Sequence, residues 1–425
     1  MTHILSRFER LFALSLLLLL GLWNAGAHAV VDGVTGTTFN LTARADYIST
    51  GDGGSLLAWG YASDAGPFPG VMQYPGPTLI VNQGDTITIN LRNELPLPVS
   101  IVFPGQAGVT TIGGTQGLLT AEVPADNGVS VVSYTFTATH AGTYQYYSGT
   151  QPDLQVEMGL VGAIVVRPAT ANQAYSHAAT AYDHEYLFLL TEMDPVIHNL
   201  VEMGLMNLVD NTTARPVLWF INGRNAPDTM ADAYLPWLPT QPYNCLPRTH
   251  PGEKILMRVI NAGRDLHPFH HHGNNATVIA RDGRMLESAP GTGPDIGVSD
   301  FTIKTVPGQT YDAIFEWTGK GLGWDMYGHA PGDPMEPNEY AGDHGKAFPV
   351  VLPNQTDLTF GGFYSGSPYL GAFGALPPGQ GGLNLNAGYF FMWHSHTEVE
   401  LTNNDIFPGG MMTMVIIEPN GVPIP

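Results

Sequence analysis

Short apolar stretches recur along the chain, and turns rich in Gly, Asn and Asp separate them. In residues 86–91 and 129–137, apolar and polar positions alternate, which predicts strands with one buried and one exposed face. Residues 159–166 are continuously apolar, as in a strand that is buried on both faces. No stretch shows a convincing helical period. The pattern therefore predicts an all-β protein.

The apolar stretches fall into two groups, which predicts two β domains. Residues 30–168 hold the first group and residues 185–425 the second, and we expect the Ala-rich, polar residues 169–184 to form a linker. Within the second group, the residues from about 319 to 385 are dense in Gly, Pro and Asn. We expect a long irregular insertion there, and its length indicates a functional or partner-binding role.

The first residues form a targeting segment rather than part of the fold. Arg7 and Arg10 precede an apolar run over residues 11–23, and a small-x-small cleavage site ends at Ala29. This order predicts a secretory signal peptide over residues 1–29. A membrane anchor is the alternative, but the run is short for a transmembrane helix. We therefore expect a soluble mature chain without a membrane span, in the periplasm or secreted.

Charged residues make up only 12% of the chain, and the formal net charge is −21. Such a charge repels nucleic acid and anionic membranes, so we expect neither as a partner. It favours cations or basic partners, although solubility outside the cell explains it more simply. The single cysteine, Cys245, cannot form an internal disulfide, and we interpret it as a structural or free thiol.

Two histidine stretches, one in the middle of the second domain and one near the C-terminus, carry the strongest chemical signal. If both are strands, His270 and His272 share one face, and so do His394 and His396. On adjacent strands the two pairs would bring four imidazoles together, and imidazole is a good ligand for copper, zinc, iron and nickel. Histidines in polar turns are the simpler alternative, but two clusters with the same spacing count against it.

Several motifs match a known family pattern. They are residues 74–78, 84–86, 142–144 and 159–162 in the first domain, and residues 220–224, 258–263, 267–273, 281–283, 394–396 and 410–411 in the second. These motifs resemble the multicopper oxidase superfamily, laccase-like proteins included. The resemblance covers most of the mature chain except the insertion. It implies two cupredoxin-like Greek-key β-sandwich or barrel domains, with copper bound in the second.

The resemblance implies a role for each histidine. By position, His267 would bind the mononuclear blue copper, whereas His270 and His272 would bind the three-copper cluster. His394 and His396 match the two cluster histidines of the C-terminal motif. These five residues are the metal ligands that we predict.

Other copper ligands of the family are replaced in this chain. The thiolate ligand of the blue copper falls at Ser395, and its second histidine falls at Glu400. A blue site needs Cys and His ligands in a trigonal arrangement, so both replacements argue against one. A neighbouring subunit cannot supply the four first-domain cluster histidines either, because every copy has other residues there. Those positions are Val102, Pro104, Tyr147 and Gly149.

What remains is a half-site of His270, His272, His394 and His396, and this name is kept below. Four neutral imidazoles could hold one cupric ion, with zinc as the alternative. We leave out His271, which should face the opposite way. A relic that binds nothing is the competing interpretation.

Two functions follow from the half-site. The first is a secreted copper-binding multicopper-oxidase-like protein, and if it is an enzyme, it is an oxidoreductase with one histidine-bound copper and not a standard laccase. The second is a non-catalytic extracellular binding or structural protein with a relic copper site. The metal ion is the expected partner, and a homo-oligomer or an extracellular protein partner stays open.

Smaller signals accompany the half-site. His329 and His344 lie in the insertion and could reach it, although solvated loop histidines are the simpler interpretation. Glu398 and Glu400 are acid–base candidates beside a metal, with surface carboxylates as the default. Met411 could offer a thioether to cuprous ion, but apolar Met in a closing strand is more often core.

Overall fold

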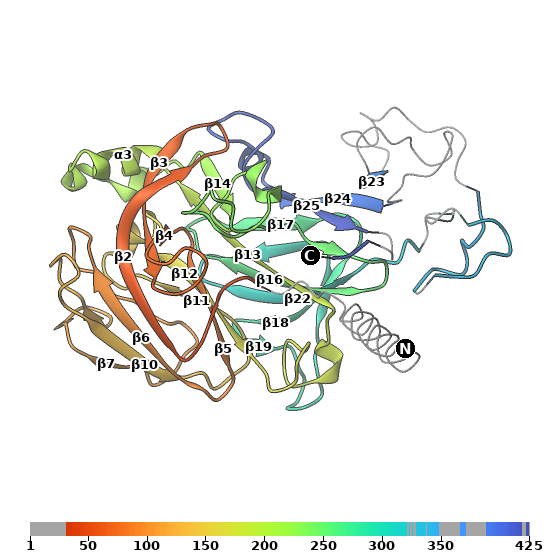
Figure 1. The fold of residues 1–425 in the computed structure, drawn as a ribbon, viewed down its shortest axis with the longest axis horizontal. Coiled ribbons are helices and arrows are strands. Elements are labelled where there is room, and N and C mark those ends of the chain that lie inside the picture. Colours follow the sequence, from red (N-terminus) through yellow and green to blue (C-terminus); the bar gives the residue numbers. More distant parts are fainter. Residues whose placement is uncertain are drawn as a thin grey trace, which may run out of the picture.

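The computed structural model of the 425-residue chain describes residues 31–320, 323, 325, 329–336, 338–347, 366–370, 388–418 and 422–424, with the backbone alone for 366–370, 388 and 389. The predicted signal peptide and most of the second half of the predicted insertion lie outside the described residues. Two pairs of β-sheets, one from each half of the chain, lie side by side (Figure 1). The all-β fold class is confirmed.

The first half of the chain builds two sheets and a small hairpin. One sheet has the order β1 (Val34–Thr35), β5 (Gly76–Asn82), β12 (Val161–Arg167), β11 (Gly142–Tyr147). The other has the order β4 (Met72–Gln73), β3 (Ser55–Ser63), β2 (Thr38–Ser49), β6 (Thr86–Asn93), β10 (Val132–Thr137), β7 (Thr110–Ile112). The hairpin pairs β8 (Thr115–Gln116) with β9 (Ala121–Glu122).

The described part of the second half also builds two sheets, one of seven strands and one of six. One sheet has the order β14 (Leu218–Ile221), β13 (His184–Met193), β16 (Lys254–Asn261), β22 (Thr310–Glu316), β18 (Ala276–Arg281), β19 (Arg284–Met285), and β20 (Val298–Asp300) also pairs with β18. The other has the order β15 (Arg248–Thr249), β25 (Met412–Ile417), β24 (Gly388–Ser395), β17 (His267–His271), β21 (Thr302–Thr305), and β23 (Gly366–Leu370) also pairs with β24.

Within the described residues, the helices are short and connect the strands. The α-helices there are α2 (Pro152–Gln155) and α3 (Pro195–Glu202), and the 3₁₀ turns are η1 (Ala178–Thr180), η2 (Met206–Leu208), η3 (Asn211–Thr213), η4 (Asp228–Met230) and η5 (Glu398–Leu401). We predicted no convincing helix, and this prediction is wrong for α3. Asp194 caps its N-terminus by accepting a hydrogen bond from Val196 N, and Pro195 occupies the first turn. Both are recognised helix-start signals, but an eight-residue helix offers too few turns for its period to stand out. Among the described residues, no helix has the length and apolar character needed to cross a bilayer.

Each half of the chain has its own apolar core, and a further core joins them. The first lies between the two N-terminal sheets, and the second lies between the two C-terminal sheets and includes Phe269 and Trp393. The third takes buried side chains from both halves. In it the rings of Tyr74 and Phe220 meet edge to face with centroids 5.5 Å apart, which adds about 0.5–1.5 kcal/mol beyond the buried area. The two halves are therefore packed against each other through apolar surface.

The segment that we predicted as a linker, residues 169–184, is packed into the junction between the halves. Tyr175 and Tyr182 are buried in an apolar cluster. Tyr175 Oη donates a hydrogen bond of 2.6 Å to Asp312 in β22. Asp312 in turn lies 3.6 Å from the buried guanidinium of Arg258. This segment therefore holds the two halves together through buried tyrosines.

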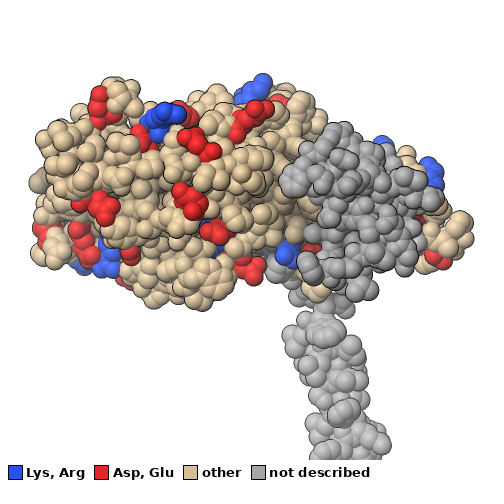
Figure 2. All heavy atoms as spheres, turned by 90° about the horizontal axis from the view of Figure 1, so that it is seen from above, with Lys and Arg blue, Asp and Glu red and all other residues tan. Residues whose placement is uncertain are grey.

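Acidic side chains are spread over the face seen in Figure 2, with fewer basic ones, and do not gather in one patch. A scattered distribution gives net repulsion between molecules without a defined docking surface. The charge of this face therefore agrees with the simpler interpretation, which is solubility.

Candidate metal centre

Strand pairing in the second half brings the two histidine stretches together. β17 and β24 are antiparallel neighbours, and His270 lies directly opposite His394. Directly opposed residues in an antiparallel pair have Cβ atoms about 4.5–5.5 Å apart, close enough for the imidazoles to meet. Burial alternates along β17, where His267, Phe269 and His271 face the core. His270 therefore faces the opposite side.

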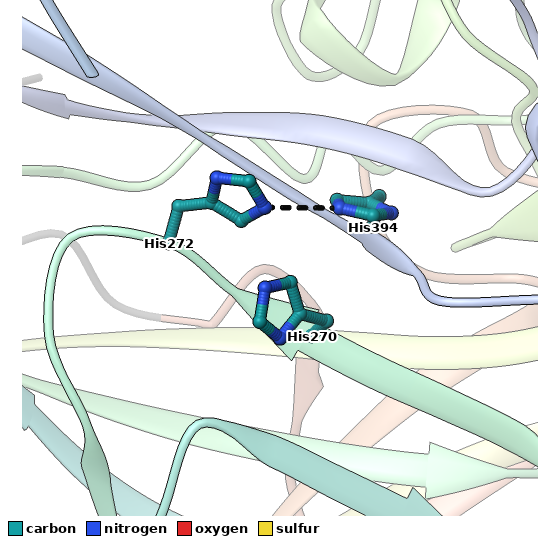
Figure 3. Close-up of side chains that lie close together, drawn as sticks. All are labelled: His270, His272 and His394. Atoms are coloured by element: carbon teal, nitrogen blue, oxygen red, sulfur yellow. Dashed lines mark hydrogen bonds between the residues drawn. The ribbon is translucent and has the colours of Figure 1, made fainter. Parts of the chain in front are cut away.

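Three of the four half-site histidines form a compact nitrogen cluster. One ligating nitrogen each from His270, His272 and His394 lies within 4.8 Å of the others. His272 Nε2 and His394 Nε2 are 3.1 Å apart, as the dashed line in Figure 3 shows, and His270 lies beside both. His396 is exposed at the edge of this cluster, and its ring centroid is 4.9 Å from that of His270. The structure thus brings the predicted half-site together.

Hydrogen bonds orient two of the half-site imidazoles. His394 Nδ1 donates to the carbonyl oxygen of Ser395 at 2.6 Å, so its Nε2 carries a lone pair toward His272. His270 Nδ1 lies 2.9 Å from Thr302 Oγ1 on the neighbouring strand β21. Hydrogen bonds to the second ring nitrogen hold metal-binding histidines in one orientation in known sites.

The surroundings of the half-site also keep two of these histidines neutral. Burial, together with the nearby His270 and His396, lowers the pKa of His394 to about 4. The pKa of His270 is lowered by burial and by His396. Only a neutral imidazole has a lone pair to offer a metal. Near neutral pH, both residues are therefore ready to act as ligands.

His267 does not join the half-site. It points to the core side of β17, where its Nε2 lies 2.9 Å from Glu192 and its Nδ1 lies 2.8 Å from Glu400. Burial alone would lower the pKa of His267, but hydrogen bonds to the two carboxylates outweigh it and raise the pKa to about 9. An imidazolium with both N–H groups donated has no lone pair for a metal. We therefore leave His267 out of the ligand set.

The Glu192–His267–Glu400 triad stands where the family resemblance implies blue copper. Ser395, which stands at the position of the thiolate ligand, is fully buried and has no thiol. Glu400 faces His267 and not the half-site, so it does not serve as an acid–base group beside the half-site. Sequence reasoning missed Glu192, since it lies 75 residues before His267 with no motif around it. Only the pairing of strands reveals this contact.

Met411 and Cys245, which the sequence analysis also considered, have structural roles. Met411 is fully buried within the apolar core of the second half. The Cys245 Sγ–H donates to the carbonyl oxygen of Thr229 at 3.2 Å, and burial raises the pKa of the thiol to about 12. An inert buried thiol of this kind does not bind metal readily.

Three of the four first-domain positions that the family resemblance assigns to cluster histidines lie together. Val102 and Tyr147 pair across an isolated bridge, with Val102 N donating to Tyr147 O at 2.9 Å. A Cβ at Gly149 would stand 2.7 Å from Val102 Cγ1. These residues offer no imidazole, and they pack against one another where the resemblance implies copper ligands.

A cavity of about 500 Å³ lies at the junction of the two halves. Its lining includes Tyr147, Glu157, Glu192 and Arg264, and the half-site histidines do not line it. The cavity therefore borders the triad at Glu192. The half-site does not border the cavity and is open to solvent beside the exposed His396.

Comparisons with known proteins agree with this fold. Residues 71–171 match a family model described as multicopper oxidase. Copper resistance protein A of Escherichia coli is 26% identical over 334 residues, which cover 71% of this chain and 50% of that protein. The chain spans about half the length of the copper resistance proteins that it matches.

Solved structures show the same architecture. The multicopper oxidase mgLAC superposes with a TM-score of 0.54 at 18% identity, covering 93% of this chain and 88% of that one. A blue copper oxidase from Nitrosomonas europaea also gives a TM-score of 0.54 at 18% identity, covering 91% and 85% of the two chains. At such identities the likeness establishes the cupredoxin-like fold alone.

Proposed function

We propose that this chain, a divergent relative of the multicopper oxidases, is an exported copper-binding protein that holds one copper ion on the half-site. The observation that carries the proposal is the convergence of His270, His272 and His394 from two strands, with His396 at their edge. The names of its relatives point to copper, and nothing in them supports zinc at this site. Export to the periplasm or the cell exterior rests on the predicted signal peptide.

The spacing of the nitrogens suits one shared ion. Two imidazole nitrogens bound at about 2.0–2.1 Å to the same metal are separated by roughly 2.9–3.4 Å, depending on the angle between the bonds. His272 Nε2 and His394 Nε2 are 3.1 Å apart. The separation of these two nitrogens therefore already matches that of two ligands of one ion.

The protein is not proposed as a standard laccase. Ser395 offers no thiolate, and His267 is held by Glu192 and Glu400, so the residues present do not fit a blue copper. The first-half positions do not complete a three-copper cluster. Copper bound by imidazoles alone supplies one-electron redox chemistry, and the exposed His396 leaves the half-site open to a small reductant from solvent.

Metal analysis with matched variants tests the proposal. Purified chain should retain about one copper at the half-site, and the variant His270→Ala/His394→Ala should lose that copper. His140→Ala is the control, because His140 is an exposed histidine in the first half. The copper-free unfolding midpoint of each variant checks that the fold is intact.

Two outcomes would overturn the proposal. Equal copper content in the wild type and the double variant would place the metal elsewhere. A stable wild-type chain that takes up no copper would leave the non-catalytic extracellular binding or structural role as the better account.

A further inference from the structure

A second group of potential metal ligands lies in the insertion, away from the half-site. One ligand atom each from Asp325, His329, Glu339 and His344 lies within 4.8 Å of the others. His329 and His344 therefore do not extend the half-site but meet two carboxylates of their own segment. The described part of the insertion extends beyond the strands of the second half (Figure 1).

The four ligand atoms form a compact set. His329 Nδ1 is 3.0 Å from Asp325 Oδ2 and 3.5 Å from Glu339 Oε1. His344 Nδ1 is 2.7 Å from Glu339 Oε1 and 3.7 Å from Asp325 Oδ2. In a tetrahedral site with bonds of about 2.0–2.1 Å, neighbouring ligand atoms are roughly 3.3–3.4 Å apart. The four distances bracket this value.

The hydrogen bonds of His344 leave one contact that needs a proton or a metal ion. His344 Nε2 donates to the carbonyl oxygen of Asp333 at 2.9 Å. A neutral imidazole has one N–H, so Nδ1 would then direct a lone pair at the Glu339 oxygen 2.7 Å away. Two facing lone pairs repel each other. A proton between the two groups, carried by His344 or by Glu339, or a metal ion that binds both atoms resolves the contact.

The two carboxylates of this group are buried, so they also need a proton or a cation to compensate their charge. Asp325 is 3% exposed, and the Glu339 side chain is 4% exposed. Buried carboxylates are costly unless a cation or several donors compensate them. The backbone N–H of Gly345 donates to Asp325 Oδ2 at 2.8 Å, which is the kind of outer contact that orients a metal-binding carboxylate.

The described part of the segment is held by polar contacts among its own residues, such as the hydrogen bond from Asp325 N to Lys346 O at 3.0 Å. None of the four buried apolar clusters takes a residue from the described part of 318–347. Polypeptide without an apolar core commonly depends on a metal or a disulfide for its structure. An ion bound here would tie Asp325 to His344 across the loop between them.

We propose that Asp325, His329, Glu339 and His344 bind one divalent first-row transition-metal ion, and that the ion orders this part of the insertion. Two imidazoles and two carboxylates in a four-coordinate set suit zinc, so Zn²⁺ is the probe of choice. The site is independent of the half-site, because the two groups share no residue.

Zinc titration of the full-length mature chain tests the second site. The background variant His270→Ala/His394→Ala removes two ligands of the half-site, so that added zinc reports on the insertion. In this background, metal-free protein should bind about one Zn²⁺. Adding His329→Ala/His344→Ala should weaken that binding at least roughly tenfold, whereas adding His140→Ala should not.

Limited proteolysis gives a second readout. Zinc should slow cleavage at the exposed residues 331–335 in the background variant and not in the variant that lacks His329 and His344. Equal zinc binding and equal cleavage in both would overturn the proposal. Protection by lowered pH alone, without zinc binding, would overturn the proposal and show instead that a proton between His344 and Glu339 resolves the contact.

Discussion

Replacing His267 by Gln should destabilise the folded chain in a pH-dependent way. The His267 imidazolium lies between Glu192 and Glu400, and no side chain of the three is more than 5% exposed. Removing the charge leaves two buried carboxylates without their shared counter-ion. Loss of one partner from a buried ion pair typically costs about 3–5 kcal/mol.

The raised pKa of His267 gives a similar stabilisation energy and determines how that stabilisation changes with pH. Its pKa is about 9 in the folded chain, against about 6.5 for an unperturbed imidazole, and this difference corresponds to about 3 kcal/mol. Because the folded pKa is raised, the contribution is fully present below about pH 6.5 and is lost as the pH rises through about 9.

The assay is urea unfolding of the wild type and His267→Gln at about pH 6 and about pH 10, followed by tryptophan fluorescence. We expect the wild type to be more stable by about 3 kcal/mol at the lower pH and by less than about 1 kcal/mol at the higher pH. Glu398→Gln, which changes an exposed carboxylate in the same turn as Glu400, should change neither value. A stability difference that is the same at both pH values would refute the charged triad.

The remaining predictions concern the half-site and the packing around it. At a hundredfold excess over its dissociation constant, copper should stabilise the wild type by about 2.7 kcal/mol, and thermal unfolding should show most of this gain absent from His270→Ala/His394→Ala. His271→Ala should lose about 1–3 kcal/mol in urea unfolding even without metal, because His271 is buried and its Nε2 accepts the Ala276 N–H at 2.9 Å; no loss would mean that this contact is unimportant. In metal-free protein, limited proteolysis followed by mass spectrometry should find cleavage at residues 331–335 before any within 169–184, and the reverse order would contradict the packing of that segment.

The sequence was sufficient for most of the sheet architecture. The strands β6 and β12 overlap the stretches 86–91 and 159–166 from which they were predicted, because alternation marks a half-buried strand and a continuous apolar run marks a fully buried one. The two longest N-terminal strands, β2 and β3, were not singled out. In β2, exposed and buried positions alternate only over residues 38–43, and the alternation breaks in the rest of the strand.

The half-site was predictable because it depends on alternation within two strands. The face shared by His270 and His272 follows from their spacing, but the register that sets His270 opposite His394 comes from the fold. Contacts such as Glu192 with His267 have no local signature, since strand pairing alone joins them. The carboxylate–histidine group of the insertion was missed for a related reason. Its two histidines were considered only as additions to the half-site or as solvated loop residues.

Copper content and spectroscopy of one variant test the central claim most directly. In His329→Ala/His344→Ala, which removes two ligands of the second proposed site, the chain should retain about one copper. Its cupric spectrum should show nitrogen ligands, without the intense thiolate-to-copper absorption, because Ser395 stands in the place of the thiolate. Adding His270→Ala/His394→Ala should remove this copper. Copper that persists after that change, or an intense thiolate band, would contradict a copper site built from the four half-site histidines.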